Sequence, residues 1–338
     1  MILIAVNLIY VVSGVIHYPL RSIDVYAIWL FKAKAFYLQS GLPLPILQNP
    51  RYLYSHPQYP LLLPLFFSKI YQLVGGVKEI YVLMLYPVIY LAILLLTYQV
   101  FRLVGLFPVP SLFFTYIYSM FSPLLAQAGR QHAGTADIIL VLINWLAIYF
   151  LYKFNQNRPL LTGWLIVILV MIGSQIKLEG LFLISLLIFL SNSWSQRFKY
   201  ISLAALPFLA WQITRFSLAI PTDFSFAFPG AVELINRLFI VFAGLIKEML
   251  NLKNWYIFWP LFVLAALLKP ASSPYIRRII LPSLLVMSGL FTAVYLFATV
   301  NTSAYVSSSI DRILLQLSPF IFIIFVDWIK RLIFTRIS

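Results

Sequence analysis

The chain has 338 residues, of which 62% are hydrophobic and only 10% are charged. A water-soluble domain carries roughly 25% charged residues, so this composition excludes water as the main solvent of the folded chain. Cysteine is absent, which excludes disulfides, and the three histidines lack the spacing of a dedicated zinc site. The net charge is +15, but Lys and Arg are scattered along loops, a pattern that suits anionic lipid headgroups better than nucleic acid.

Apolar runs follow one another along the chain with short polar breaks. They approach the length of about 20 residues that a helix needs to cross the hydrocarbon core, and they do not alternate as the strands of a membrane barrel do. The first run lacks a basic segment before it, so we interpret it as a span rather than a cleaved signal peptide. We predict ten spans, near residues 1–17, 80–102, 109–127, 135–153, 160–175, 179–192, 200–220, 255–268, 279–299 and 313–332.

The predicted fold is therefore an all-α polytopic membrane protein, a single domain over residues 1–338. Several predicted spans are short, which tilted helices or buried half-helices would explain. Two long loops interrupt the pattern of spans, at residues 18–79 and 221–254. We expect interfacial helices in the first of them.

Short loops predict the orientation of the chain. If the N-terminus is cytoplasmic and residues 59–75 do not cross fully, each short outer loop holds at most one basic residue, whereas the inner loops and the tail hold more. These inner basic residues are Lys153, Arg158, Arg197, Lys199, Lys269, Arg277, Arg278, Lys330, Arg331 and Arg336. The two long loops carry many Lys and Arg and weigh little either way. In this orientation eight of the nine acidic residues lie outside, which suggests an outer-face site, although solvated loop charges would give the same pattern.

The first outer loop begins with a candidate catalytic acid. Val25, Ile28, Trp29 and Phe36 fall on one helical stripe, which predicts an interfacial helix lying on the bilayer with Asp24 at its start. Asp24 is either an N-cap residue or a general base, placed where an acceptor from the water side meets a lipid-borne donor. Both interpretations stay open on the sequence alone.

A proline-rich stretch follows at residues 55–64. Three prolines prevent a regular helix start there and stiffen the backbone. The apolar run 61–74 is too short to span comfortably and could dip into the outer leaflet. His56 is a loop residue, a polar anchor or an acid–base group.

Further charged residues stand near the outer ends of later spans. Asp137 either caps the fourth span or faces the same cavity as Asp24. Lys177 and Glu179, between the fifth and sixth spans, form a structural pair or serve separately as a phosphate contact and a site carboxylate. Arg312 opens the last span, where its planar guanidinium suits a phosphodiester but could equally reach bulk lipid headgroups.

The order of these motifs is more informative than any one of them. The sequence resembles the GT-C superfamily of polyprenyl-phosphate-sugar-dependent glycosyltransferases, and within it the bacterial branch of protein mannosyltransferase-like, aminoarabinose transferase-like and lipopolysaccharide-core galacturonosyltransferase-like proteins. The motifs that carry the resemblance are short but cover most of the chain. They are Asp24…Trp29…Lys32-Ala33-Lys34, His56-Pro57-Gln58-Tyr59-Pro60-Leu61, Gly134-Thr135-Ala136-Asp137, Lys177-Leu178-Glu179-Gly180, and Arg312 with Leu315 and Pro319.

The resemblance implies many spans, outer interfacial helices and an active site on the non-cytoplasmic side of a bacterial plasma (inner) membrane. Asp24 would be the catalytic base or acceptor-positioning group, with Asp137 as a second acid. Lys177, Glu179 and Arg312 would recognise the donor, with the two cations near its phosphate.

Two features depart from the family pattern. Gln58 stands where relatives often carry an acid, which weakens any claim of a carboxylate pair or metal there. The chain is also short for the superfamily and lacks an appended outer domain. Recognition of the acceptor would therefore fall to residues 221–254 or to a partner.

The chemistry that such a transfer requires is compatible with these residues. Inverting sugar transfer needs a base for the acceptor proton and positive groups for the departing phosphate. Asp24 is the candidate base, and Lys177, Arg312 and Arg130 are the candidate positive groups. A divalent cation could replace some of that charge, so the use of a metal is left open.

The predicted function is transfer of a sugar from a polyprenyl-phosphate donor to a lipid, glycan or protein acceptor, by a protein that contacts membrane lipids and no nucleic acid. A transporter or flippase is one alternative, and it would place acids and broken helices near the bilayer midplane. A non-catalytic membrane scaffold is the other.

Overall fold

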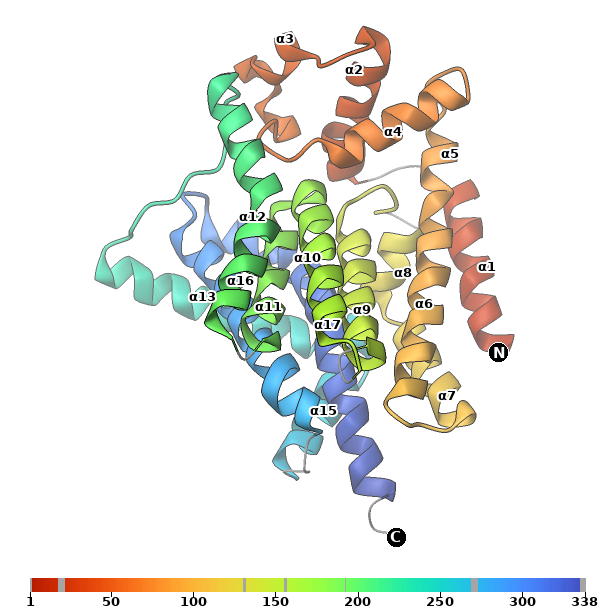
Figure 1. Ribbon diagram of the computed structural model, residues 1–338. Coiled ribbons are helices and arrows are strands. Elements are labelled where there is room, and N and C mark those ends of the chain that lie inside the picture. The colour runs from red at the N-terminus through yellow and green to blue at the C-terminus, as the bar shows by residue number, and fades with distance from the viewer. Residues whose placement is uncertain are drawn as a thin grey trace.

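The computed structural model describes residues 2–17, 22–129, 132–154, 157–191, 193–268 and 273–334. Within these ranges the protein is helical and has no β-strand, and its extended pairing is an isolated antiparallel bridge between Phe226 and Ala298. Figure 1 shows a bundle of upright helices with a layer of shorter helices across its upper end. The prediction of an all-α class is confirmed.

Twenty-one helical elements follow one another in the described ranges, with η marking a 3₁₀- or π-helix. The first eleven are α1 (Ile2–His17), η1 (Asp24–Leu30), α2 (Phe31–Gln39), α3 (Leu44–Leu47), η2 (Pro50–Ser55), α4 (Leu62–Leu73), α5 (Glu79–Leu83), α6 (Leu85–Leu103), α7 (Pro108–Ser119), α8 (Ser122–Gly129) and α9 (Asp137–Phe154). The remaining ten are α10 (Pro159–Ile176), η3 (Leu178–Leu183), α11 (Ile184–Leu190), α12 (Trp194–Ser217), α13 (Ala231–Met249), α14 (Leu252–Trp255), α15 (Phe258–Leu267), η4 (Ile276–Ile280), α16 (Leu281–Phe297) and α17 (Thr302–Phe334).

Five of the described helices are long and apolar enough to cross a membrane. They are Glu79–Leu103, Asp137–Phe154, Pro159–Ile176, Ile276–Phe297 and Thr302–Leu332. A sixth span results if α7 and α8, which meet at a bend of 71°, are counted as one. The shorter apolar helices Ile2–His17, Leu178–Leu190 and Phe258–Leu267 coincide with three further predicted spans. The protein is thus consistent with an integral membrane protein, and the number of ten spans stays a prediction.

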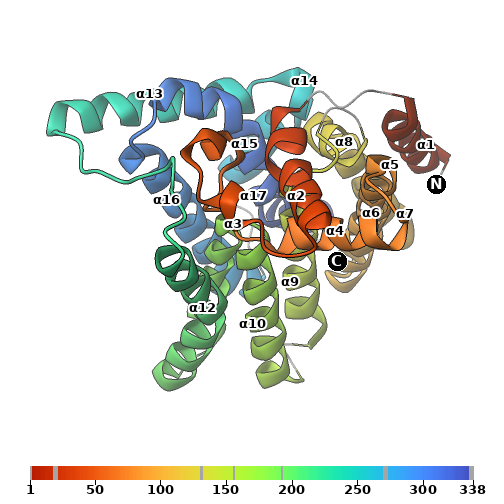
Figure 2. The same ribbon diagram turned by 90° about the horizontal axis from the view of Figure 1, so that it is seen from above.

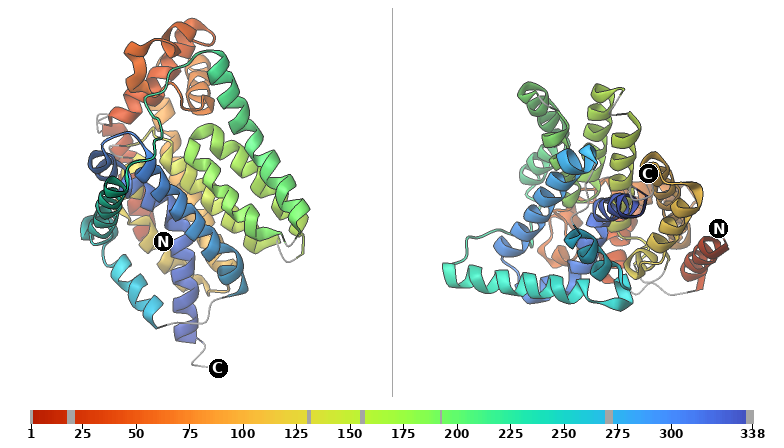
Figure 3. Two further views of the ribbon diagram at one scale, coloured as in Figure 1. Left: turned by 90° about the vertical axis from the view of Figure 1, so that its left-hand side faces the viewer. Right: turned by 90° about the horizontal axis from the view of Figure 1, so that it is seen from below.

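Helix α17 forms the centre of the bundle, as the view from below in Figure 3 shows. In its most apolar stretch 83% of the residues are buried inside the protein. Phe322 of this helix packs against a shell of aromatic rings, at centroid distances of 5.2–6.2 Å for most of them. These rings belong to Phe101, Phe114, Tyr118, Phe121, Phe258 and Phe325. Because lipid tails are as apolar as these side chains, close packing rather than exclusion from water holds the helix centre together.

The first long loop folds over the upper end of the bundle as η1, α2, α3, η2 and α4 (Figure 2). The predicted apolar stripe of this segment faces the protein rather than the bilayer, since Val25, Ile28, Trp29 and Phe36 are all buried. Trp211 of α12 fixes the layer from the side by donating a hydrogen bond to the carbonyl of Gln58 (2.8 Å). The stripe is therefore a packing surface for the bundle.

The second long loop contains a helix that the sequence analysis did not predict. Helix α13 runs along one side of the molecule in Figure 2, and its exposed apolar residues recur at helical spacing. These are Val232, Ile235, Phe239, Phe242 and Ile246. Such a stripe on a helix that also carries four charged residues is typical of a helix that lies in the membrane interface.

Candidate functional site

Charged side chains from four distant segments meet near the upper end of the bundle. Arg312 of α17 pairs with Asp24 of η1, and the same Nη1 atom lies 3.6 Å from Oδ2 of Asp137 at the start of α9. Lys177, between α10 and η3, bridges Asp137 and Glu179 with distances of 2.9 Å to each carboxylate. The five side chains form one continuous chain of ion pairs, which we call the Asp24–Arg312 cluster. Three carboxylates and two cations leave it with one excess negative charge.

One carboxylate of the cluster is buried, and the other two are accessible from outside the protein. The side chain of Asp137 is 2% exposed, whereas those of Asp24 and Glu179 are 34% and 22% exposed. Gln316 adds a neutral hydrogen bond to Asp137 Oδ1 at 2.7 Å, and its carbonyl accepts from Asn144 at 2.8 Å. Asp137 thus holds Lys177 and Arg312 from below, and the two accessible carboxylates are those that another molecule can reach.

Two glycines explain the motifs around these carboxylates. Gly134 has φ +111°, which L side chains rarely adopt, and a Cβ atom there would lie 2.5 Å from Val25 Cγ1. The residue therefore allows η1 to approach the start of α9. A Cβ atom on Gly180 would lie 2.2 Å from the backbone of Gly173, so glycine is needed where the chain turns back after Lys177.

Asp24 does not cap its own helix. The N-cap position of η1 is Ile23, and no side chain caps this end. The carboxylate of Asp24 turns instead toward Arg312, 288 residues away in the sequence. The N-cap interpretation of Asp24 is therefore wrong, and its partner comes from tertiary structure.

A second polar cluster lies over the same end and involves the predicted residue His56. Its Nδ1 atom lies 2.8 Å from Oδ2 of Asp223, and Gln58 donates a hydrogen bond to the other oxygen of that carboxylate. Lys32, which is completely buried, donates to the carbonyl of His56 at 3.0 Å. Tyr59 stacks on the His56 ring at 4.9 Å. We call these residues the His56–Asp223 cluster.

Tyr59 connects the two clusters. Its hydroxyl is close enough to Lys177, Glu179 and Arg312 for their charges to act on it, although burial is the main reason that its pKa is raised above the ordinary value. Trp29 of η1 stacks on the same ring at 5.8 Å. Tyr59 thus contacts His56 and lies close to the charges of the Asp24–Arg312 cluster.

Burial and neighbouring charges set the protonation of these groups. Burial raises the pKa of Asp223, but the hydrogen bond and charge of His56 and the hydrogen bond of Gln58 outweigh it, so the pKa lies below the ordinary value. Burial lowers the pKa of Lys32 to about 7, with partial compensation from Asp223. Burial also acts against the charge of Lys177, yet Asp137 and Glu179 hold its pKa well above the ordinary value.

The structure thus brings together five of the seven site residues predicted from sequence, namely Asp24, Asp137, Lys177, Glu179 and Arg312, and places His56 in the adjacent cluster. Arg130 lies outside the described residues. Asp223 was not singled out, because nothing near it in the sequence marks it and its partners lie 165 residues or more away.

Other acids have partners outside these clusters. Glu79 pairs with Lys34 at 2.5 Å, and Glu233 pairs with Arg237 four residues further along α13. Glu248 accepts hydrogen bonds from Asn254 and Trp255. These contacts tie down loops and helix ends.

An apolar cavity of about 190 Å³ lies between α13, α16 and α17. Its wall includes Ile310 and Ile313, which flank Asp311 and Arg312 in the sequence, and Tyr295. The hydroxyl of Tyr295 shares a hydrogen bond with Ser309 at 2.8 Å. The cavity wall thus includes Ile313, the residue that follows Arg312 in α17.

Over the described ranges, no group of three or more His, Cys, Asp or Glu side chains is arranged to hold a metal ion. The carboxylates of the Asp24–Arg312 cluster are instead paired with Lys177 and Arg312. No family profile, curated protein or solved structure matches this chain.

Proposed function

We propose that this protein is a membrane glycosyltransferase, which moves a sugar from a polyprenyl-phosphate donor to an acceptor at the end of the bundle that carries the Asp24–Arg312 cluster. The observation that supports it most is the contact of Arg312 with both Asp24 and Asp137, because it joins the candidate base and the candidate phosphate ligand in one place. The proposal extends to the orientation of the chain, with this end on the non-cytoplasmic side.

The reaction would proceed as an inverting displacement. The acceptor hydroxyl forms a bond to the anomeric carbon, the bond from that carbon to the donor phosphate breaks, and the electron pair leaves with the polyprenyl phosphate. Asp24, the most exposed carboxylate of the cluster, takes the acceptor proton. Lys177 and Arg312 stabilise the negative charge of the phosphate, and Asp137 keeps both cations in position.

The apolar cavity beside α17 supports a lipid-linked donor. A polyprenyl phosphate requires an apolar surface for its chain next to cations for its phosphate. The cavity lined by Ile310, Ile313 and Tyr295 meets the first requirement, and Arg312 meets the second.

The His56–Asp223 cluster supports the resemblance at the position where the sequence departs from it. Gln58 replaces the acid that relatives often carry, and it donates a hydrogen bond to Asp223, which comes from the second long loop. A carboxylate is thus present near this stretch after all. The cluster gives residues 221–254 a direct connection to the site, as acceptor recognition by that loop would require.

The proposal is tested with purified protein in nanodiscs and a panel of polyprenyl-phosphate sugars labelled in the sugar, with envelope lipids and glycans as acceptors. We expect at least one donor to lose its label to the acceptor fraction. Asp24→Asn should reduce this transfer at least about 100-fold, as loss of a general base does.

Glu79→Gln is the matched control, because it removes another partly exposed acid of the same end that pairs with Lys34 outside the cluster. Its transfer rate should stay within about twofold of the wild-type rate, in line with the small effects of exposed ion pairs. The proposal is overturned if none of the donors is consumed and none raises the stability of the protein. It is also overturned if Asp24→Asn and Glu79→Gln reduce transfer equally.

A further inference from the structure

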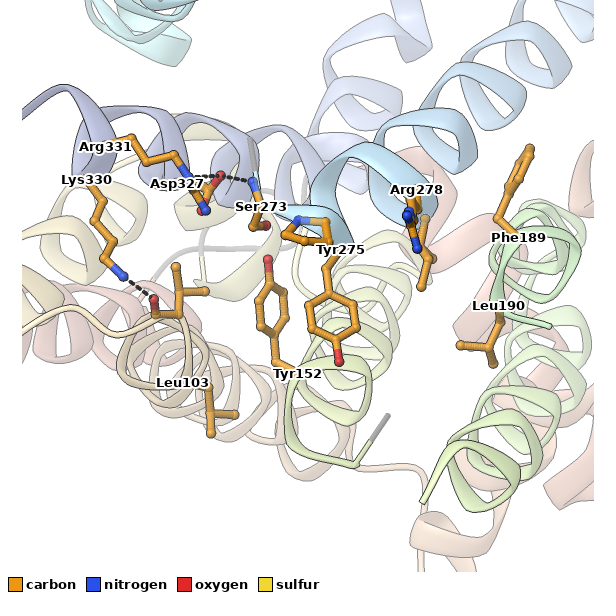
Figure 4. Close-up of a pocket in the computed structure, with 13 residues that line it drawn as sticks. Leu103, Tyr152, Phe189, Leu190, Ser273, Tyr275, Arg278, Asp327, Lys330 and Arg331 are labelled. Atoms are coloured by element: carbon orange, nitrogen blue, oxygen red, sulfur yellow. Dashed lines mark hydrogen bonds and ion pairs between the residues drawn. The ribbon is translucent and has the colours of Figure 1, made fainter. Parts of the chain in front are cut away.

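The opposite end of the bundle holds a larger and more polar pocket, with a volume of about 600 Å³. The ends of α6, α9, α11 and α17 and the segment from Ser273 to Ile279 form its wall (Figure 4). Tyr152 lines this pocket at the far end of α9, fifteen residues from Asp137. At 1.5 Å per residue this separation is about 22 Å, so the pocket is distinct from the Asp24–Arg312 cluster.

Cations outnumber carboxylates in the wall of the pocket. Arg278, Lys330 and Arg331 face a single acid, Asp327. Asp327 already accepts a hydrogen bond from the backbone of Ser273 at 3.0 Å and one from Arg331 at 3.3 Å. Two positive charges therefore remain in excess.

Arg278 and Lys330 are the cations with donors left for another molecule. Lys330 donates to the carbonyl of Val104 at 2.8 Å, which uses one of its three N–H groups. Arg278 has neither an ion pair nor a hydrogen bond with any other described residue, and its guanidinium lies at the pocket wall in Figure 4. A planar guanidinium with five unused N–H donors is suited to two oxygens of one phosphate.

The rest of the wall suits an amphipathic molecule. Leu103 lies at one end of the pocket and Phe189 and Leu190 at the other, and the hydroxyl of Tyr152 points toward Ser273 between them (Figure 4). Leu103 is also exposed on the outside of the bundle, where lipid would contact it. The volume exceeds what a phosphate group alone fills.

We propose that this pocket binds a phosphate-bearing anion, with the headgroup of an anionic phospholipid as its source. Basic pockets between helices at a membrane end are suited to such headgroups, because the cations hold the phosphate and the apolar wall holds the start of the acyl chains. Arg278 is the phosphate ligand, Arg331 is kept in place by Asp327, and Lys330 lies across the pocket from Arg278 in Figure 4, where it adds positive charge to the wall. This site does not depend on the proposed sugar transfer.

The test measures binding to the delipidated full-length protein in detergent by native mass spectrometry and thermal shift. The probes are phosphatidylglycerol, the zwitterionic phosphatidylcholine and inorganic phosphate. Phosphatidylglycerol should bind saturably and raise the unfolding temperature, whereas phosphatidylcholine should do neither. Arg278→Gln should weaken the binding of phosphatidylglycerol about tenfold, as loss of a charge-assisted hydrogen bond predicts.

Arg158→Gln is the matched control, because this exposed arginine stands beside α10 outside the pocket wall. Its affinity should equal that of the wild type, and both variants should unfold at the wild-type temperature without added lipid. If inorganic phosphate binds through Arg278 and neither lipid binds, the pocket is a phosphate site whose ligand is a soluble anion rather than a lipid headgroup. Equal binding of both lipids, equal effects of the two substitutions, or no binding of any probe overturns the proposal.

Discussion

A single buried lysine gives the first loop a pH-dependent stability. Lys32 has no exposed surface, and burial lowers its pKa to about 7 from 10.5. The unfolded chain therefore binds more protons than the folded one between these two pH values. The contribution of Lys32 to the free energy of unfolding therefore rises with pH across that window, by up to about 1.4 kcal/mol per pH unit. That contribution is lost as the pH falls toward 7.

Comparison with Lys32→Met isolates this effect. Between pH 7.5 and 9.5 the thermal stability of the wild type should increase relative to that of the variant, because methionine does not titrate. Lys34→Met, which removes a nearby exposed lysine, should follow the wild-type trend. A constant difference between wild type and Lys32→Met across this range would show that the lysine is not buried in the folded protein.

The planar fork of Arg312 matters for the proposed donor. Arg312→Lys keeps the charge but loses the ability to hold two oxygens at once, so we expect the KM for the polyprenyl-phosphate sugar to rise about tenfold. The KM for the acceptor should change little. Arg237→Lys is the control, since Arg237 also pairs with a carboxylate, that of Glu233, but belongs to α13. Equal changes in both KM values would contradict the assigned role.

At the scale of elements, the close approach of η1 to the start of α9 depends on Gly134. Gly134→Ala adds a Cβ atom 2.5 Å from Val25 Cγ1 at φ +111°. Gly75→Ala is the control, because Gly75 has φ +69° but nothing within 4 Å of the added atom. Gly75→Ala should cost about 1 kcal/mol from backbone strain alone, and Gly134→Ala roughly 1–3 kcal/mol more from overpacking.

Denaturation in detergent measures both costs, and the double variant Val25→Ala/Gly134→Ala tests their origin. Removal of the Val25 methyl groups should recover part of the loss at Gly134, giving a coupling between the two sites. Additive effects would mean that the two residues do not meet as described.

Most elements were predictable because the length of an apolar run can be counted directly. The predicted spans near 135–153 and 160–175 coincide with α9 and α10. Helix α13 was missed because four charges interrupt its apolar residues, and only their helical spacing marks the element. A helix beginning at Asp24 was expected, but the 3₁₀- or π-helical geometry of η1 to η4 was not, since tertiary packing rather than local sequence selects it.

At the scale of the whole molecule, the orientation can be tested directly because the chain contains no cysteine. Lys78 and Arg158 are exposed at opposite ends of the bundle. In intact cells Lys78→Cys should react with a membrane-impermeant maleimide, whereas Arg158→Cys should react only after the membrane is opened. The reverse pattern would place the Asp24–Arg312 cluster in the cytoplasm and remove support for a polyprenyl-phosphate donor from the outer leaflet.

The contacts between distant residues were predictable only in part. The order of short motifs predicted that Asp24, Asp137 and Arg312 share one place, and the structure brings them together. Which side chain faces water could not be predicted, because it depends on the depth of each helix end. The role of Asp223 could not be predicted either, because a loop residue acquires a partner such as His56 only when two loops fold over one another.

The pairing of Arg312 with Asp24 has a consequence for timing under the proposed reaction. An incoming phosphate competes with the Asp24 carboxylate for the guanidinium of Arg312. Binding of the donor phosphate therefore releases Asp24 from Arg312 in the same step. Until that step, Oδ2 of Asp24 is held by Arg312 and is not available to take a proton. Premature attack by water on the sugar would thereby be suppressed without any moving lid.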